Sequence, residues 1–434
     1  MTLRIIATVL GLAAVLGVAT LASPEAGGAP GAGATIAIEP VRQPVACPGP
    51  LTIPVGSISS GDEDLDSGST DVVYETTPSG TPLGDGVAVD ASQAVTLERV
   101  ATGDIAGLAG LACTAPARDQ WLVGGSTELG ASARLVLSNP TDSSVRARVQ
   151  VYGPVGQGEE ATSVLLGPTS QETLLLESIE PELPTIAVHV RSEGVGVAAA
   201  LQDSRLDGFT AAGTDWVSPS QPASSLVIPV AGPATADAPA ELALLAPDGA
   251  EATLTLLTED GPQPWLGNES LELEPGVLTD IQVPAVGLAA IRIDASAPVV
   301  AGARVQVARE APLDDGSLAF DHGWTAAQDT SEQRVRAAVV PDGEVSLIVA
   351  SPGATTFTAD AEGEAVTVDV EDGAVTSVPL DLEPGTVLTS TDAASWALLV
   401  TDQEAGFVTT VEPVVTEIAG REIAVSVGGY ALVP

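Results

Sequence analysis

Two histidines are the first candidates for acid–base catalysis or metal binding in this chain, because imidazole titrates near neutral pH and ligates metals. His189 lies in the alternating apolar stretch Ile186–Val190, which predicts a strand whose imidazole faces away from its apolar neighbours. His322 lies in Phe320–Trp324, which we interpret as a loop. Neither has a second histidine or a cysteine at metal-ligand spacing. We therefore expect neither residue to carry catalysis or a metal.

Serine and carboxylate motifs are also incomplete. The Gly-Gly-Ser segment at 124–126 lacks the second flanking glycine of a nucleophile turn, and no phosphate-binding loop is present. Asp62, Asp64 and Asp66 have the alternate spacing with which a loop wraps Ca²⁺. The glycine of that loop comes one place late, and Val73 occupies the position of the closing glutamate. We expect a solvated acidic loop, with calcium binding as the alternative.

Cys47 and Cys113 are the only cysteines of the sequence. In an exported protein, two cysteines most simply form one disulfide. Metal binding is the alternative, but no histidine lies near either thiol along the chain. The sequence therefore predicts a Cys47–Cys113 disulfide, no metal site and no cofactor.

Tryptophan is the remaining residue type with a binding role, since exposed aromatic platforms hold carbohydrate rings. Trp216 and Trp324 recur 108 residues apart, which indicates repeated core or hinge packing. Trp265 follows Gln263-Pro264 in a hairpin extension and is the one tryptophan that we expect to be exposed. It is the candidate ligand-binding residue of the chain.

Composition limits the classes of partner. The formal charge is −43, and none of the 15 basic residues is a lysine. This balance excludes nucleic acid and anionic lipid headgroups, which both require clustered basic residues. The acidity is typical of a highly soluble surface. Apolar residues are 45% of the chain and aromatic residues only 3%, so we expect a folded protein with aliphatic cores.

The chain begins with an exported-protein signature. Ile5–Ala22 contains no charged residue and follows Arg4 directly. Its length lies between a signal peptide and a short membrane span, so cleavage after Ala22 and a retained anchor both stay open. Both place the rest of the chain outside the cytoplasm, in contact with a membrane only through this segment. Pro24–Ala34 is a Pro/Gly/Ala spacer.

A repeat of about a hundred residues organises the rest of the chain. An apolar strand runs into a proline-led turn at Leu135–Asp142, Leu242–Gly249 and Leu347–Ala354. The three prolines of these turns are spaced by 107 and 105 residues. Each period is long enough to bury a core of its own, so the repeat predicts an array of β-modules.

The second period gives the clearest strand pattern. Seven strands are predicted at Leu226–Val230, Glu241–Leu245, Thr253–Thr258, Ser270–Glu274, Leu278–Val283, Ala290–Asp294 and Val299–Val307. Seven short alternating strands separated by turns favour an immunoglobulin-like sandwich. A β-propeller with two blades per period is the alternative, but the two halves of a period do not resemble each other.

The domain boundaries follow from these patterns. We expect a signal peptide or anchor at 1–22, a linker at 23–34, an N-terminal β-region with the disulfide at 35–120, and sandwiches at 121–222, 223–328 and 329–434. The N-terminal β-region should pair with or cap the first sandwich.

Three segments carry a family resemblance: Trp121–Thr127, Ala133–Pro140 and Val151–Pro154. With them, the chain resembles an uncharacterised family of actinobacterial exported or membrane-anchored proteins built of tandem immunoglobulin-like β-modules. The resemblance covers most of the chain after its apolar start. It implies an exported, envelope-associated protein and supplies no catalytic residue.

The sequence thus predicts an all-β protein, made of tandem immunoglobulin-like β-sandwiches after an N-terminal signal or anchor segment. We expect a non-catalytic structural or protein-interaction scaffold of the cell envelope, whose partner is an envelope protein. The alternative is a module that binds cell-wall glycan through Trp265. An enzyme that works with acid pairs is the third class, and no residue is placed for it.

Overall fold

A computed structural model describes residues 34–38, 44–52, 80–89, 94–208, 210–232, 235, 238–309, 319–331, 333–416 and 421–425. The chain divides into two compact units, one formed by residues 1–41 and 418–434 and the other by residues 42–417. The apolar segment at 5–22, nearly all of the linker at 23–34 and the acidic loop around Asp62 lie outside the described residues. Within the described ranges, no helix is long and apolar enough to span a membrane.

The first unit brings the two ends of the chain together. Strand β1 (Ala34–Ile38) pairs antiparallel with β35 (Arg421–Val425), so that Ala34 lies opposite Val425. The sequence placed residues 329–434 in one sandwich. The structure instead ends that sandwich at Val415 and uses β35 to pair with the segment that follows the linker.

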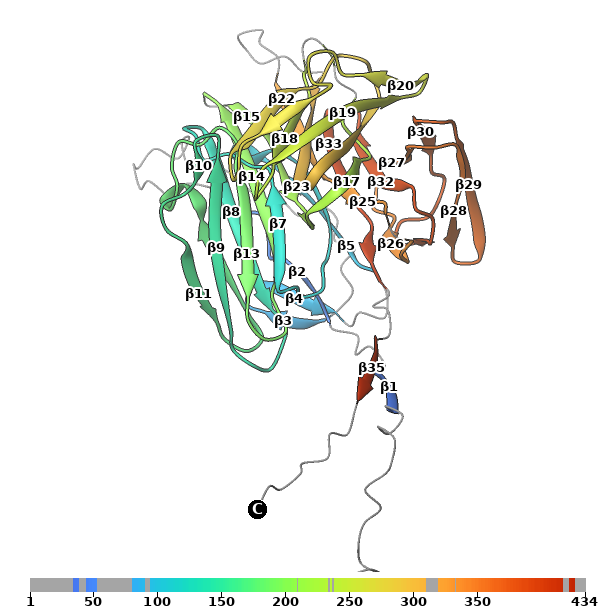
Figure 1. Cartoon of the computed structure of the whole chain (residues 1–434). Helices are drawn as coiled ribbons and strands as arrows, with labels where there is room; N and C mark the ends of the chain where they lie inside the picture. The colour runs from blue at the N-terminus through green and yellow to red at the C-terminus, as the bar shows by residue number, and fades with distance from the viewer. Residues whose placement is uncertain are drawn as a thin grey trace, which may run out of the picture. The chain divides into compact units, whose positions relative to one another are not determined.

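The second unit is built of β-sandwiches and confirms the all-β fold class (Figure 1). In the first module, one sheet contains β7 (Asp119–Val123), β9 (Val145–Gly153), β10 (Gly156–Gln157), β11 (Thr162–Leu166), β13 (Ala187–Ser192) and β16 (Pro219–Ser220). The facing sheet has the order β12 (Ser170–Leu175), β8 (Ala131–Asn139), β14 (Ala198–Asp207) and β15 (Thr210–Val217). The short 3₁₀ helix η2 (Leu176–Ser178) follows β12.

The second module repeats this plan. Its first sheet contains β17 (Ala223–Ile228), β19 (Ala250–Thr258), β20 (Gly261–Pro264), β21 (Leu271–Leu273), β23 (Ala289–Ala308) and β25 (Gln328–Asp329). The other has the order β22 (Leu278–Gln282), β18 (Glu241–Leu245), β23 and β24 (Phe320–Ala326). The two strands expected at Ala290–Asp294 and Val299–Val307 are therefore one long strand, β23, whose halves belong to different sheets.

The third module has the same two sheets. One has the order β29 (Glu364–Val370), β28 (Thr355–Ala361), β31 (Val387–Ser390), β26 (Arg336–Val339) and β34 (Val414–Val415). The other has the order β30 (Ala374–Pro379), β27 (Glu344–Ser351), β32 (Ser395–Asp402) and β33 (Phe407–Val411). The β28–β29 turn has positive φ at both Glu362 and Gly363, as a two-residue type I′ hairpin requires.

The sequence repeat marks the same strand in each module. Its leucines Leu135, Leu242 and Leu347 lie on β8, β18 and β27, each an inner strand of a four-stranded sheet. These strands are buried on their core face and lead into the proline turns. The repeat therefore encodes one sandwich plan used three times.

The N-terminal β-region is smaller and contains the predicted disulfide. It consists of β2 (Val45–Cys47), β3 (Thr81–Leu83), β4 (Gly86–Val89), β5 (Thr96–Ala101), the 3₁₀ helix η1 (Gly103–Ile105) and β6 (Gly107–Ala112). Cys47 and Cys113 are bonded and buried, which confirms the predicted pair. Thr52 N–H donates to the side-chain carbonyl of Gln202 in the first module. Thr96 Oγ1 donates to Val339 O in the third, so this region contacts two modules and not the first alone.

Apolar clusters join the modules in a cycle. Trp121 of the first module packs with Leu245 of the second, and Ile291 of the second packs in one cluster with Ile348 of the third. The N-terminal hairpin β5–β6 then lies between the third and first modules. Leu108 joins the core of the third module, and a second cluster from the hairpin covers β8 and β14 of the first. Every module is thus packed on a neighbour through an aliphatic interface.

Candidate functional site

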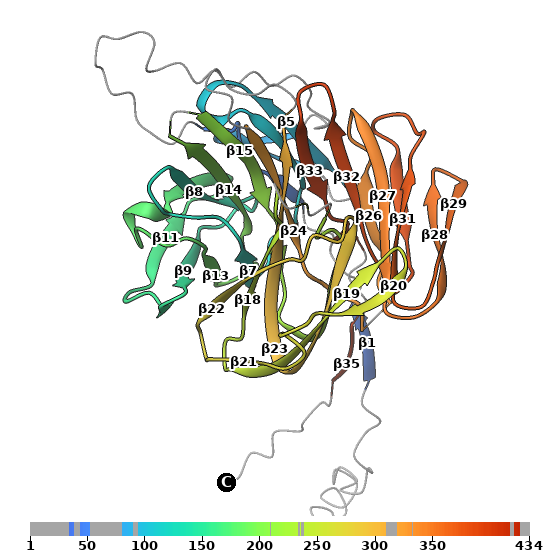
Figure 2. The same cartoon turned by 90° about the horizontal axis from the view of Figure 1, so that it is seen from above.

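The edges of three sheets meet at the centre of the second unit. Strands β15, β24 and β33 are the last strands of the three four-stranded sheets, and Figure 2 shows them side by side. Strand β6 of the N-terminal hairpin packs against all three. An edge strand presents backbone N–H groups without partners in its own sheet, and in a buried edge these groups need other acceptors.

The strand pairing shows which residues of the three edges are equivalent. From each repeat leucine, two successive register steps lead across the sheet to Val217, Thr325 and Val411. Counted from these three residues, the equivalent positions four earlier are Gly213, Asp321 and Phe407. The positions two earlier are Asp215, Gly323 and Thr409. The positions one later are Ser218, Ala326 and Glu412. Each of these three sets contains one carboxyl group, and each module supplies one of the three. We call Asp215, Asp321 and Glu412 the junction acids.

Asp215, from the first module, binds all of its neighbours. Its Oδ2 accepts a hydrogen bond from Trp324 N at 2.7 Å, in the second module. Its Oδ1 accepts from Thr409 Oγ1 at 2.7 Å in the third module and from Gly110 N at 3.1 Å in the hairpin. One side chain therefore links all three modules and the N-terminal region.

Asp321, from the second module, binds the third module and the hairpin. Its Oδ2 accepts from Val408 N at 2.9 Å and from Leu108 N at 3.4 Å. Its Oδ1 is buried without a hydrogen-bond partner and lies against Gly213, where a Cβ atom would come within 2.6 Å of it. Glycine at that position leaves room for the carboxyl group of the neighbouring module.

Glu412, from the third module, completes the set. Its Oε1 accepts from Ala326 N at 2.6 Å, and its Oε2 accepts from Ser218 Oγ at 2.8 Å. Ser218 and Ala326 are its equivalents in the other two modules. The three junction acids thus replace the missing sheet partners of the edge strands, each at a different level along the edges.

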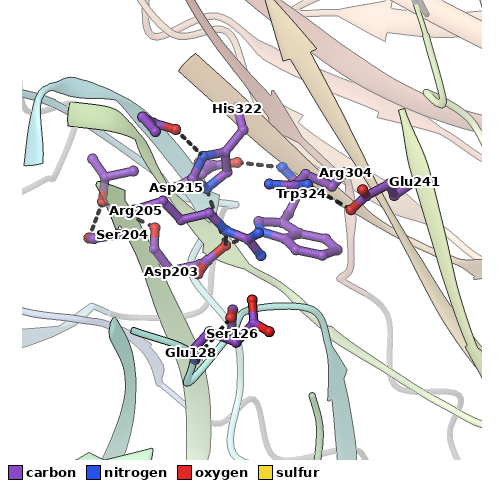
Figure 3. Close-up of polar contacts among 12 residues, drawn as sticks. Ser126, Glu128, Asp203, Ser204, Arg205, Asp215, Glu241, Arg304, His322 and Trp324 are labelled. Atoms are coloured by element: carbon purple, nitrogen blue, oxygen red, sulfur yellow. Dashed lines mark hydrogen bonds and ion pairs between the residues drawn. The ribbon is translucent and has the colours of Figure 1, made fainter. Parts of the chain in front are cut away.

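A second polar cluster lies beside the junction and is centred on Asp203 of β14. Its Oδ2 accepts from Trp324 Nε1 and from Arg205 Nε, both at 2.9 Å. His322 Nε2 lies 3.3 Å from the same oxygen, and His322 Nδ1 donates to Ala212 O at 3.0 Å. Figure 3 shows Arg205, His322 and Trp324 gathered around Asp203. Two modules contribute to this cluster, because His322 and Trp324 belong to β24.

Burial controls the protonation of the junction. It raises the pKa of Asp321 and of Glu412 to about 7 in each case, and it raises the pKa of Asp215 well above its usual range. Burial also acts on Asp203, but Arg205, His322 and Trp324 outweigh it and hold the pKa of Asp203 below its usual range. Burial lowers the pKa of His322. The centre therefore favours neutral acids at the junction and one ionised carboxylate beside it.

Within the described residues, the polar groups of the junction are enclosed by the chain. Asp203, Asp215, Asp321 and His322 are all 0% exposed, and their polar atoms face other parts of the chain. General acid–base catalysis needs groups within hydrogen-bond reach of a bound substrate. Within the described ranges, no three histidine, cysteine, aspartate or glutamate side chains are grouped to hold a metal ion. The arrangement is suited to joining modules.

A surface pocket of about 700 Å³ adjoins the Asp203 cluster at Arg205. Its wall includes Leu129, which is fully exposed, and the carboxyl groups of Glu128 and Glu182. Acidic groups also line two pockets at the third module, as expected from a charge of −43. The pocket chemistry therefore singles out no class of ligand.

The structure corrects two expectations about single residues. Trp265 is only 3% exposed, because its ring packs into the core of the second module with Leu254 and Leu256, so the predicted exposed platform is wrong. A binding role for Trp265 stays a prediction. His322 lies in strand β24 and not in a loop, since Phe320–Ala326 pairs with β23.

The other sequence candidates have structural partners. His189 is buried in β13, its Nε2 lies 3.0 Å from Asp119 Oδ1, and its ring stacks on Trp121. Ser126 is 1% exposed and donates to Leu183 O. Trp216 and Trp324 are buried at module contacts, as their repetition indicated, with Trp216 against the N-terminal hairpin and Trp324 against the core of the first module.

Sequence reasoning missed the junction acids. They are three of 58 acidic residues, and each stands at a different offset from the repeat leucine, so no repeated motif contains them. One signal was available, namely an acid within three residues of the recurring tryptophans, as in Asp215-Trp216 and Asp321–Trp324. Only the contacts between edge strands of different modules show that these acids join the modules.

Comparisons with known proteins add a family and no activity. Residues 69–391 match the model of a family of unknown function, DUF5719. No curated protein matches the chain. The crystal structure of Thermotoga maritima 1070 is 16% identical over 24% of this chain and 94% of that protein, with a TM-score of 0.21, from which we draw no conclusion.

Proposed function

Since the chain belongs to the DUF5719 family, whose function is unknown, its geometry is the main guide, and we propose that it is a non-catalytic scaffold of the cell envelope. The observation that carries this proposal is the use of the buried polar groups. Both carboxyl oxygens of Asp215 accept hydrogen bonds, and the donors come from three other parts of the chain. A fold that commits its titratable centre to holding modules together presents fixed loops and strand edges to partners.

The proposed location is outside the cytoplasm. The buried Cys47–Cys113 disulfide suits an oxidising compartment, and the apolar segment at 5–22 suits export. Whether that segment is cleaved or retained as an anchor, the modules face the same side of the membrane. An actinobacterial origin and immunoglobulin-like topology for the sandwiches are part of this proposal.

Cross-linking in intact cells tests the scaffold role. A tagged full-length protein should be recovered from the envelope fraction with its two cysteines unreactive to a thiol reagent, cross-linked reproducibly to one set of envelope proteins. The matched variant Gly213→Val crowds the junction at Asp321 Oδ1 and changes no exposed loop. We expect it to lose those cross-links. Recovery from the cytosol with reactive thiols would contradict the proposed location, and identical cross-links from both proteins would contradict the rigid scaffold.

Glycan binding is the alternative, and the structure gives it no exposed tryptophan, because Trp265 is buried. Retention of the pure protein on isolated cell wall separates the two roles. The scaffold proposal expects no retention at physiological salt. Retention that soluble wall fragments compete away would favour the glycan-binding role instead.

A further inference from the structure

The junction acids are buried without a direct ion pair within the described residues. Within the described residues, Asp215 and Glu412 form no ion pair, and only Arg309 of the same module acts on Asp321 from a distance. A buried carboxylate without a cation costs much more free energy than a buried neutral carboxylic acid. Protonation therefore neutralises the acids at this interface, which is the role that a paired arginine or lysine has at other buried carboxylates.

The hydrogen bonds provide a place for each proton. Asp321 Oδ2 accepts two N–H groups while Oδ1 has no donor, so Oδ1 is the oxygen that can carry hydrogen. Glu412 Oε2 and Asp215 Oδ1 each face a hydroxyl group, of Ser218 and Thr409. A hydroxyl can donate to a carboxylate or accept from a carboxylic acid, so both contacts survive protonation.

We infer that the modules dock tightly when the junction acids carry protons. Asp215, Asp321 and Glu412 are neutral acids when the modules are docked, and ionisation of these groups loosens the contacts among β6, β15, β24 and β33. The inference goes beyond the proposed function, because it concerns how the modules are held and not what they hold. The contacts among the modules of the second unit are then more stable in mild acid than in alkali.

Among the remaining charged groups, His322 opposes this direction, and the three junction acids outnumber it. Asp203, Arg205 and Arg304 face His322, and Arg309 faces Asp321. Burial, with Arg205 and Arg304, lowers the pKa of His322 although its Nε2 lies 3.3 Å from the Asp203 carboxylate, so protonation of His322 opposes docking as pH falls below its usual pKa. The acids have pKa values raised above their unfolded values, so the docked state binds more protons than the open state between pH 4 and pH 7, and stability is lost as pH rises through that range.

Local amide exchange on the full chain tests the inference. The reporters are peptides that contain Gly110, Trp324, Ala326 and Val408, whose N–H groups the junction acids accept. After correction for the intrinsic exchange rate, each group that ionises should favour opening by about tenfold per pH unit between its two pKa values. We expect protection at these amides to fall by at least tenfold from pH 5 to pH 8.

Isosteric variants assign the effect. Asp321→Asn and Glu412→Gln keep the accepting oxygens and cannot ionise, so each should reduce the pH dependence of protection by about tenfold per pH unit. Asp280→Asn is the control, because burial raises the pKa of Asp280 to about 6 at a place outside the junction. Equal pH dependence in the wild type and the junction variants overturns the inference.

A measurement on the unmodified protein covers the case in which a variant does not fold. Infrared difference spectra between pH 6 and pH 9 should show the carbonyl band of protonated carboxylic acids at pH 6, from the junction acids and from Glu98, since ordinary side-chain acids are ionised there. Loss of that band should follow the loss of amide protection over the same pH range. Absence of the band at pH 6 means that the acids are ionised in the docked state, and the inference is then wrong.

Discussion

Single side chains at the centre differ in charge although they lie close together. Asp203 stays ionised because Arg205, Trp324 and His322 all point at its Oδ2. Asp321 accepts backbone N–H groups and has Arg309 only at a distance, so it favours the neutral acid. The number and charge of the donors therefore decide the state of each carboxyl group, since both are fully buried.

Removal of the Asp203 carboxylate tests its role directly. Asp203→Ala leaves Trp324 Nε1 and the mostly buried Arg205 without their acceptor, and we expect a loss of about 3–5 kcal/mol in the free energy of unfolding. Asp294→Ala is the control, because its pair with Arg292 is about 40% exposed on both sides and should cost about 0–1 kcal/mol. Urea unfolding gives both values, and similar losses for the two variants would count against the ionised state of Asp203.

Residue-level prediction from sequence succeeded where one residue type dictates one outcome. Two cysteines in a chain expected to be exported implied a disulfide, and the recurring Trp216 and Trp324 implied packing. It failed for Trp265, because the pairing of β20 with β19 brings the ring into the module core, and local hydropathy does not report which side of a hairpin is buried. The role of Asp203 could not be predicted, because its partners Trp324 and His322 lie over a hundred residues away along the chain.

At the scale of strands, glycine makes the close contact of edges possible. Gly213 of β15 lies against Asp321, and Gly110 of β6 lies against Thr409, where an added Cβ would come within 2.9 Å of the hydroxyl oxygen. Edge strands normally avoid such contact to prevent aggregation. Here the free edges are hidden inside the chain.

Gly213→Ala is the corresponding experiment. The residue has φ of +101°, and its Cβ would meet Asp321 Oδ1 at 2.6 Å, so both backbone strain and crowding oppose the change. Gly363→Ala is the matched control, with φ of +100° and no atom within 4 Å of the new Cβ. We expect Gly213→Ala to be the more destabilising by about 1–3 kcal/mol in urea unfolding. Equal costs would mean that the junction relaxes around the methyl group.

Strand-level prediction recovered most of the second module, including Glu241–Leu245 with both ends correct. Its main error was the division of β23 at Ser296-Ala297-Pro298, which reads as a turn. Pro298 is exposed in a segment where β23 passes from one sheet to the other, so its missing N–H costs no ladder bond. A local pattern cannot distinguish such a transition from a turn.

In the second unit, the N-terminal region joins the third module to the first, because the hairpin β5–β6 packs against both. The disulfide joins β2 to the segment after β6 across 66 residues of chain. In a chain-entropy model, loss of a disulfide that closes a loop of that size lowers the free energy of unfolding by about 4 kcal/mol. The double variant Cys47→Ala/Cys113→Ala should therefore lose that amount in urea unfolding, as the wild type should in reductant. A wild type indifferent to reductant would show that the bond adds nothing to the folded state.

The pH dependence of global stability follows from the buried acids taken together. Burial raises the pKa of Glu98, Asp321 and Glu412 to about 7 and that of Asp280 to about 6, so the folded chain holds protons that the unfolded chain releases above pH 4. Asp203 has a lowered pKa, and its contribution is present above its unfolded value and lost in stronger acid. We therefore expect the melting temperature to be highest near pH 5 and to fall by several degrees at pH 8.

Charge repulsion in a chain of −43 gives a fall with the same sign, so salt must separate the two causes. Surface repulsion is screened over about 4 Å at 0.5 M salt, whereas the ionisation of the buried Asp321 and Glu412 is screened much less. A fall between pH 5 and pH 8 that persists in 0.5 M sodium chloride, and that shrinks in Glu412→Gln, assigns the effect to the buried acids. A fall that salt removes completely assigns it to the surface, and the protons at the junction then contribute nothing to global stability.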